Sequence, residues 1–341
     1  MESKSLVNFK NPSAADRKQA LGAMGGTPFK LKKALEGVEN YWAPIRDPEP
    51  NDWLANEFES GQGYQDFLCN KNAFVEKGKQ DMICILPLDK KMSLSFLKNM
   101  QKMCQAFFLG CQIKILPSIE FQDIDKLESR VVQSEYNGTE HTQYNASKIL
   151  SWLFRVYKPK YPKAICFMAI TTEDIYPEDP QGIESFSYVF GLANVMTQSG
   201  IFSFYRYDPA FNGDQVSSQE EADNIILYRA CKVMTHEIGH MFGIRHCIYY
   251  ECGMNGSNHI QECESRPMYF CAVCFRKLAT AVGFDPVERY EKLIEICQEF
   301  GGRFEEDGLW FQRRCEDLKK TFQKLIAGNI KVNTDKKLVK R

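Results

Sequence analysis

Between residues 81 and 116, apolar residues follow two different rhythms, which predict strands and a helix in turn. The run MICILPL (82–88) is short and almost wholly apolar, as expected for a buried strand. In segment 93–110 apolar residues recur at helical spacing until Gly110 ends the helix, and CQIKIL (111–116) is a second strand. A strand, a helix and a strand in this order form a βαβ unit. We therefore expect parallel strands in a sheet that is covered on both faces.

Strands and helices continue to alternate up to the middle of the chain. Residues 129–150 predict a strand, an Asn-Gly turn and the start of a helix that reaches about Tyr157. The most apolar strand is AICFMAIT (164–171). The segments SYVFGLANV (187–195) and GIFSFYRY (200–207) predict two strands in an antiparallel or ribbon-like arrangement. Together these elements indicate the α/β (α+β) class.

A long helix is predicted from about Gln219 to Phe242. The preceding residues, SQEE, are typical of a capping box, with Ser218 at the N-cap and Glu221 at the third helical position. This helix matters because it carries two of the three histidines discussed below.

The chain divides into three parts. Residues 1–78 predict helix fragments and loops, and we identify no chemistry in them. Beyond the middle of the chain, segments 291–300 and 314–326 have helical periodicity, and the last residues are polar and basic. We therefore expect an N-terminal helical and irregular extension, a main domain over 79–285, and C-terminal helices with a basic tail over 286–341.

Composition and charge exclude several classes of protein. The chain has 341 residues, of which 44% are hydrophobic, so it is able to form a substantial core. Its 43 basic and 44 acidic side chains leave a net charge of -1, which gives no electrostatic reason to expect nucleic acid or a membrane surface as partner. The first residues lack the apolar core of a secretory signal, and no run approaches the roughly 20 apolar residues of a membrane span.

Cysteine usage is also typical of a protein that is not secreted. Of 13 cysteines, eight are scattered, mostly in apolar runs where a free thiol behaves as a small buried hydrophobe. The other five fall between Cys247 and Cys274, and this cluster needs a separate explanation. We expect a cytoplasmic protein that is not secreted, with the nucleus as a further location beside the cytoplasm. The sequence leaves the oligomeric state open.

The segment HEIGHMFGIRHC contains three histidines at metal-binding spacing. His236 and His240 are four residues apart, so on a helix their rings project from one face, with Glu237 beside them. Gly243 is suited to end the helix with a positive φ, after which His246 can approach the same ion. Three nitrogen ligands leave the fourth position of Zn²⁺ open for a water molecule, whose proton Glu237 is placed to accept.

Chance is the main alternative for this motif, because a bare HExxH occurs in many unrelated helices. Here the glycine and the third histidine also stand at the required offsets, and three of the five histidines fall within eleven residues. We therefore favour a metal site. The other two, His141 and His259, are expected to be ordinary surface or loop histidines.

The cysteine cluster predicts a second metal site of a different kind. A C-x-x-C pair, Cys271 and Cys274, follows a front pair, Cys247 and Cys252, and four thiolates form a closed tetrahedral zinc site. Such a site has no open position, so its role is to stabilise the loop-rich segment 247–274. The alternatives are buried free thiols or a reducible disulfide. Cys263, which has no partner at this spacing, is a weaker candidate ligand and belongs to the same cluster.

The segments CKVMTHEIGHMFGIRHC and RPMYFCAVCFRKL, within residues 231–278, closely resemble the archaemetzincins. A weaker resemblance extends back to about residue 164. These are metzincin-type zinc metallopeptidases with an additional four-cysteine zinc site. The resemblance implies a mixed five-stranded sheet with backing and active-site helices over a zinc-stapled lower lobe, and a substrate cleft between them.

The resemblance also implies roles for particular segments. An antiparallel edge strand would align the substrate, and GIFSFYRY (200–207) with the preceding VFGLA is the segment we expect in this role. Met254 would be the methionine packed beneath the catalytic zinc, with Met268 as a lesser candidate. Two zinc ions per chain are expected, one catalytic and one structural.

These observations predict a zinc metallopeptidase that hydrolyses peptide or protein substrates through a zinc-bound water activated by Glu237. The alternative is a non-catalytic, zinc-stabilised peptide-binding or adaptor protein. Whether the enzyme is an endopeptidase or an aminopeptidase stays open, and Tyr249, Tyr250 and His259 are possible helpers in oxyanion stabilisation. Neighbouring side chains in extended backbone point to opposite sides, so His246 and Cys247 are expected to bind different ions.

Overall fold

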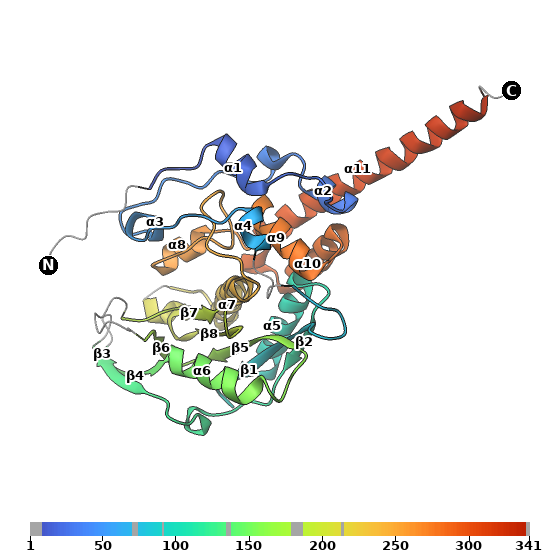
Figure 1. Ribbon diagram of the computed structural model, residues 1–341. Coiled ribbons are helices and arrows are strands. Elements are labelled where there is room, and N and C mark those ends of the chain that lie inside the picture. The colour runs from blue at the N-terminus through green and yellow to red at the C-terminus, as the bar shows by residue number, and fades with distance from the viewer. Residues whose placement is uncertain are drawn as a thin grey trace.

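A five-stranded mixed sheet forms the centre of the computed structural model, which describes residues 9–69, 74–90, 92–133, 138–178, 187–212 and 215–338 (Figure 1). The strand order is β2–β1–β5–β8–β7; the first four strands are parallel, and β7 pairs antiparallel with β8. The strands are β1 (Met82–Pro87), β2 (Gln112–Ile115), β5 (Ala164–Thr171), β7 (Gly191–Asn194) and β8 (Ser199–Ser203). The expected α/β class and mixed five-stranded sheet are confirmed.

Helices cover both faces of this sheet. Helix α6 (Ala146–Tyr157) packs on one face, and α5 (Leu94–Phe107) and α7 (Gln219–Met241) pack on the other. In β1, Ile83 belongs to the core shared with α5 and α7, whereas Cys84 belongs to the core shared with α6. Residues of β1 therefore alternate between two apolar environments, which is why the strand is a continuous hydrophobic run. The predicted βαβ unit is confirmed.

Helix α7 begins with the predicted N-cap and ends at the predicted glycine. The Ser218 hydroxyl accepts a hydrogen bond from the Glu221 N–H, but the Glu221 carboxylate accepts from Ser217 instead of completing the capping box. At the other end Gly243 has a φ of 84°, a left-handed conformation that favours glycine. This turn directs the chain back beneath the helix.

The N-terminal part and the C-terminal helices lie together on the side of α7 away from the sheet (Figure 1). Their side chains share one core with α5 and α7; Trp42 and Phe67, for example, belong to the same cluster as Phe270. No helix among the described residues is long and apolar enough to cross a membrane. The helices are α1 (Ala14–Leu21), α2 (Phe29–Ala34), α3 (Trp53–Asn56), α4 (Tyr64–Leu68), α8 (Ile260–Ser265), α9 (Ala272–Val282), α10 (Pro286–Phe300) and α11 (Glu305–Leu338).

A second sheet, of three strands, was not expected. Strand β4 (Glu140–Asn145) lies between β3 (Ser129–Gln133) and β6 (Asp174–Tyr176). The first residue of β6, Asp174, is fully buried and accepts hydrogen bonds from Arg206 and from His141. His141 is thus a strand residue with a buried partner, and the expectation that it is an ordinary surface or loop histidine was wrong. The Asn137 of the expected Asn-Gly turn lies outside the described residues.

The expected edge strand is also corrected. Segment 200–207 does not supply the edge, because β8 lies between β5 and β7 and all five of its residues are buried. The chain then forms a short 3₁₀ turn at Tyr205–Tyr207. The edge is β7, which contains the GLA of the preceding VFGLA segment. Apolar patterning does not distinguish the two, because both strands consist of small and apolar residues.

Candidate active site

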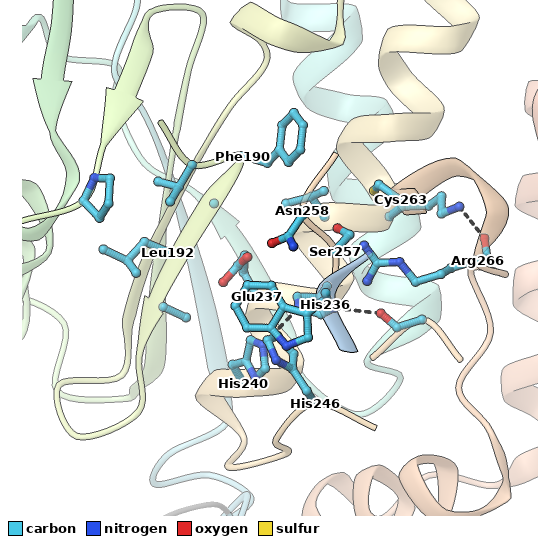
Figure 2. Close-up of a pocket in the computed structure, with 18 of the residues that line it drawn as sticks. Phe190, Leu192, His236, Glu237, His240, His246, Ser257, Asn258, Cys263 and Arg266 are labelled. Atoms are coloured by element: carbon cyan, nitrogen blue, oxygen red, sulfur yellow. Dashed lines mark hydrogen bonds between the residues drawn. The ribbon is translucent and has the colours of Figure 1, made fainter. Parts of the chain in front are cut away.

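Three histidine rings converge beside the C-terminal half of α7 (Figure 2). His236 and His240 project from the same face of the helix, one turn apart, and His246 reaches them after the turn at Gly243. One ring nitrogen from each lies within 4.8 Å of those of the other two. The structure therefore brings together the three residues that the motif singled out.

Hydrogen bonds fix how each ring is oriented. Each Nδ1 atom lies close to an oxygen acceptor: Gly253 O at 2.8 Å for His236, Ile244 O at 2.7 Å for His240, and Glu59 Oε1 at 2.6 Å for His246. We infer that each Nδ1 carries the proton, which leaves the lone pair of each Nε2 directed at the shared centre. Partners of this kind are typical around metal-binding histidines.

The arrangement of the Nε2 atoms fits a cation. The Nε2 atoms of His236 and His240 are 3.0 Å apart. Since both rings already use their proton at Nδ1, neither has a hydrogen to donate across this gap. Burial lowers the pKa of His240 to about 3 and that of His236 well below its usual value, so both rings are neutral, as metal binding requires. A metal ion with nitrogen ligands satisfies all three lone pairs.

Glu237 supplies a buried carboxylate next to this centre. The residue is 6% exposed, and its Oε2 atom has no hydrogen-bond partner among the described residues. Burial raises the pKa of Glu237 to about 8, although the positive charge of Arg266 acts in the opposite direction. A carboxylate with a free oxygen and a raised proton affinity is suited to accept a proton from a water molecule.

The opposite wall touches this carboxylate at a glycine. A Cβ atom added to Gly191, the first residue of β7, would lie 2.6 Å from Glu237 Oε1. Only a residue without a side chain allows the edge strand and the carboxylate to approach this closely. Gly191 was not singled out from the sequence, where it is one glycine among 22.

A cleft of about 820 Å³ contains the histidines and Glu237. Strand β7 and the residues before it form one wall, and residues from Gly253 to Met268 form the opposite wall (Figure 2). Tyr249, Tyr250 and His259 do not line this cleft. Their proposed help in oxyanion stabilisation therefore has no geometric support.

The four predicted cysteines form a second, fully buried group. One sulfur atom from each of Cys247, Cys252, Cys271 and Cys274 lies within 4.8 Å of the others. The backbone N–H groups of Met254 and Cys271 donate to the Cys252 sulfur, a pattern that stabilises thiolate over thiol. All four cysteines are free, so this donor set fits a closed tetrahedral zinc site.

Cys263 is not part of this group. It lies on α8, is 5% exposed, and lines the wall of the cleft. Cys263 is therefore a buried residue of the cleft wall and not a ligand of the four-cysteine group, although it lies among those cysteines in the sequence.

The loop between the two groups connects them physically. The Cys247 N–H donates to Met254 O, and the next carbonyl back, that of Gly253, accepts the hydrogen bond from His236. Met254 is fully buried against α7: a Cβ added to Gly239 would lie 2.6 Å from its sulfur. Met254 thus packs on the helical turn between the two helical histidines, whereas Met268 lies in the cleft wall.

The N-terminal part contributes to the site, which the sequence did not reveal. Glu59 accepts from His246 and, at 3.0 Å, from the Trp53 indole; these hydrogen bonds outweigh burial and hold the pKa of Glu59 below its usual range. Gln62 donates to Gly243 O and accepts from the Arg245 N–H, so it stabilises the turn that precedes His246. No sequence signal links these residues to a motif more than 180 positions away.

A third group of possible metal ligands already has protein partners. Glu262 accepts from the backbone N–H groups of Trp53 and Asn258, and His259 lies 3.1 Å from Asp52. These contacts join the N-terminal part to α8. They account for the group without an ion.

The comparisons with known proteins agree with this geometry. Residues 111–280 match the model of Peptidase family M54. The chain is 32% identical over 328 residues to archaemetzincin-2 of Rattus norvegicus, an alignment that covers 87% of each chain. The chain belongs to the archaemetzincin family. As an archaemetzincin it is a zinc metallopeptidase, and peptides or proteins are its substrates.

Two further archaemetzincins have a lower identity to this chain. Archaemetzincin-1 of Homo sapiens is 26% identical over 276 residues, which cover 74% of this chain and 53% of that protein. A crystal structure of archaemetzincin from Methanopyrus kandleri has 22% identity and a TM-score of 0.43, and the match covers 62% of this chain and 100% of that one. The family model begins at residue 111. The N-terminal residues that contact the site, Trp53, Glu59 and Gln62, therefore lie before the matched segment.

Proposed function

We propose that His236, His240 and His246 hold the catalytic Zn²⁺ and that Glu237 is the general base and acid of peptide hydrolysis. The observation that carries this proposal is the convergence of three histidine ring nitrogens beside a buried carboxylate oxygen that has no partner among the described residues. When bound, zinc supplies a Lewis acid that polarises the substrate carbonyl and lowers the pKa of water.

The residues of this chain perform the remaining tasks. Glu237 accepts a proton from the attacking water and delivers it to the leaving amine. Among the described residues, strand β7 pairs with β8 alone and its residues line the cleft, so its backbone is suited to pair with an extended peptide. Gly191 keeps this strand next to the Glu237 carboxylate. The scissile bond is thereby positioned between the metal site and the base.

We further propose a second, structural zinc at Cys247, Cys252, Cys271 and Cys274, and a metzincin-type role for Met254 beneath the histidines. Free, buried thiols and N–H···S contacts support the zinc site, and the contact of Met254 with Gly239 supports the role of the methionine. In the division that we propose, residues 79–285 form the catalytic unit. Residues 1–78 support it, and residues 286–341 form the C-terminal helices and tail. Free cysteines are consistent with the cytoplasm or nucleus as the location.

The Glu237→Gln variant tests the proposed mechanism. It should keep its zinc content and lose about 100- to 10,000-fold in kcat, because the carboxamide cannot accept the proton. Glu220→Gln, an exposed position in the first turn of the same helix, is the matched control and should behave as the wild type. Equal hydrolysis by the Glu237→Gln variant would exclude Glu237 as the base. Peptide binding without any hydrolysis by the wild type would favour the non-catalytic alternative.

A further inference from the structure

Arg266 places a buried positive charge in the wall of the cleft. The residue is 8% exposed and follows α8, and its side chain extends into the pocket with the guanidinium at the end nearest Ser257 (Figure 2). Its Nε atom lies 3.4 Å from Glu262 O. Among the described residues, its two Nη groups have no hydrogen-bond acceptor and no carboxylate within ion-pair distance.

Nearby carboxylates are already engaged elsewhere. Both oxygens of Glu262 accept hydrogen bonds from backbone N–H groups, and Glu264 forms a salt bridge with Arg229. Glu237 has the role of base in the proposed mechanism. The Arg266 guanidinium lines the cleft with no carboxylate partner among the described residues, and a charge pair at a site this little exposed is only weakly screened by water. A bound ligand can supply the anion that the described part of the chain does not.

The surrounding structure holds Arg266 in place. The Lys232 ammonium donates to the backbone carbonyls of Glu264 and Arg266, and Pro267 restricts the backbone on the other side. The Lys232 ammonium therefore stabilises the wall through these hydrogen bonds. The rigid wall thus presents one guanidinium with free donors.

Arg266 lies along the same cleft as the reacting groups. Arg266, His236 and Glu237 all line this cleft, so a peptide held with its scissile bond at the histidines shares the cleft with the guanidinium. A single planar guanidinium matches one carboxylate, which it can bind with two parallel hydrogen bonds. A peptide offers two such groups, an acidic side chain and its C-terminal carboxylate.

We propose that Arg266 is a specificity residue that binds a carboxylate of the peptide substrate next to the scissile bond. The ligand class is thus an anionic peptide. This inference rests on the proposed function, because it takes the cleft to be the substrate site. It assigns to Arg266 the recognition of substrate and not the stabilisation of the transition state.

Binding of matched peptides tests the inference without turnover. The probes are fluorescein-labelled alanine hexapeptides that carry one Glu or one Gln at each position in turn, with a free or an amidated C-terminus. They are titrated against the full-length, zinc-loaded Glu237→Gln protein by fluorescence anisotropy. At one position, or at the free C-terminus, the acid should bind about 10- to 100-fold more tightly than its amide. The position that shows the effect distinguishes a side chain from the C-terminus.

Variants and turnover separate this role from the alternatives. Arg266→Gln should remove the preference for the acid, whereas Arg245→Gln, at an exposed arginine that does not line the cleft, should retain it. In wild-type turnover the preference should be found in KM rather than in kcat. If Arg266→Gln retains the acid preference but lowers kcat on every peptide, the inference is overturned. Arg266 would then stabilise the transition state and not bind a substrate carboxylate.

If Arg266→Gln does not fold, the peptide titrations on the protein with Arg266 intact still test the inference. Equal binding of every acid and amide pair overturns the inference, whether or not the peptides are cleaved. A clear acid preference in binding without any hydrolysis leaves the inference intact and refutes the proposed peptidase mechanism instead. The two failures are thereby distinguishable.

Discussion

Gly191→Ala is a small change whose effect on catalysis can be worked out from the contact between β7 and the base. The added methyl group would lie 2.6 Å from Glu237 Oε1, 2.9 Å from Cδ and 3.0 Å from Cγ. An ordinary contact begins at about 3.4 Å, so the carboxylate has to move by roughly 0.8 Å. Since Glu237 is not one of the proposed metal ligands, the three histidines should be unaffected.

A displacement of this size is large for a catalytic group. Misplacement by about 1 Å can reduce a rate by up to about 100-fold, so we expect kcat to fall by roughly 10- to 100-fold. This corresponds to about 1.4–2.7 kcal/mol in the activation free energy. Thermal stability should change little, because an alanine in a strand restricts the unfolded chain and partly offsets the strain.

The assay compares kcat, KM and zinc content of Gly191→Ala with those of the wild type. Gly25→Ala is the matched control, because a Cβ at Gly25 would meet no atom within 4 Å. Unchanged kcat in Gly191→Ala, with the protein folded and zinc-loaded, would refute the placement of Glu237 as the base beside β7. Loss of zinc in this variant would show instead that the strand supports the histidines.

Three further predictions concern the support of the two sites. Glu59→Gln should weaken zinc affinity by about 10- to 100-fold by removing the carboxylate that orients His246, as measured by competition with a chelator. Cys247→Ser should lower the zinc content and also reduce hydrolysis, although the residue is no catalytic ligand; unchanged values of both would exclude coupling between the sites. Asp174→Asn should destabilise the protein by about 3 kcal/mol in urea unfolding, because it removes the buried negative charge that pairs with Arg206. Hydrogen bonds from Arg206 outweigh burial and keep the pKa of Asp174 below its usual value. The wild-type stabilisation is therefore complete above about pH 4 and lost as the pH falls through the lower folded-state pKa; a wild-type unfolding free energy independent of pH below 4 would contradict this.

The central sheet was predictable because its signals are local. Each residue of β5 is buried and all but the last, Thr171, are apolar, and the α5 segment has a clear helical period between two apolar runs. The clustering of the proposed metal ligands was predictable for the same reason, since a helix and a short turn bring the histidines together within eleven residues.

The features that the sequence did not predict depend on contacts between distant segments. Strand β6 has three residues, and its pairing with β4 joins segments about 30 positions apart. Strand β7 is the edge because β5 pairs with β8 and not with β7. The pattern of side chains along the two strands does not encode this pairing. Glu59 is one acidic residue in a polar loop, and its role depends on His246, 187 positions later.

Zinc X-ray absorption on the metal-loaded protein, combined with elemental analysis, tests the central claim most directly. The claim is that the adjacent residues His246 and Cys247 belong to two different metal sites, one with an open position and one closed. It predicts two zinc ions per chain. The averaged shell should contain about two sulfur atoms at about 2.3 Å and about two nitrogen or oxygen atoms at about 2.0–2.1 Å per zinc. One zinc per chain, or a shell of sulfur alone at full loading, would contradict it.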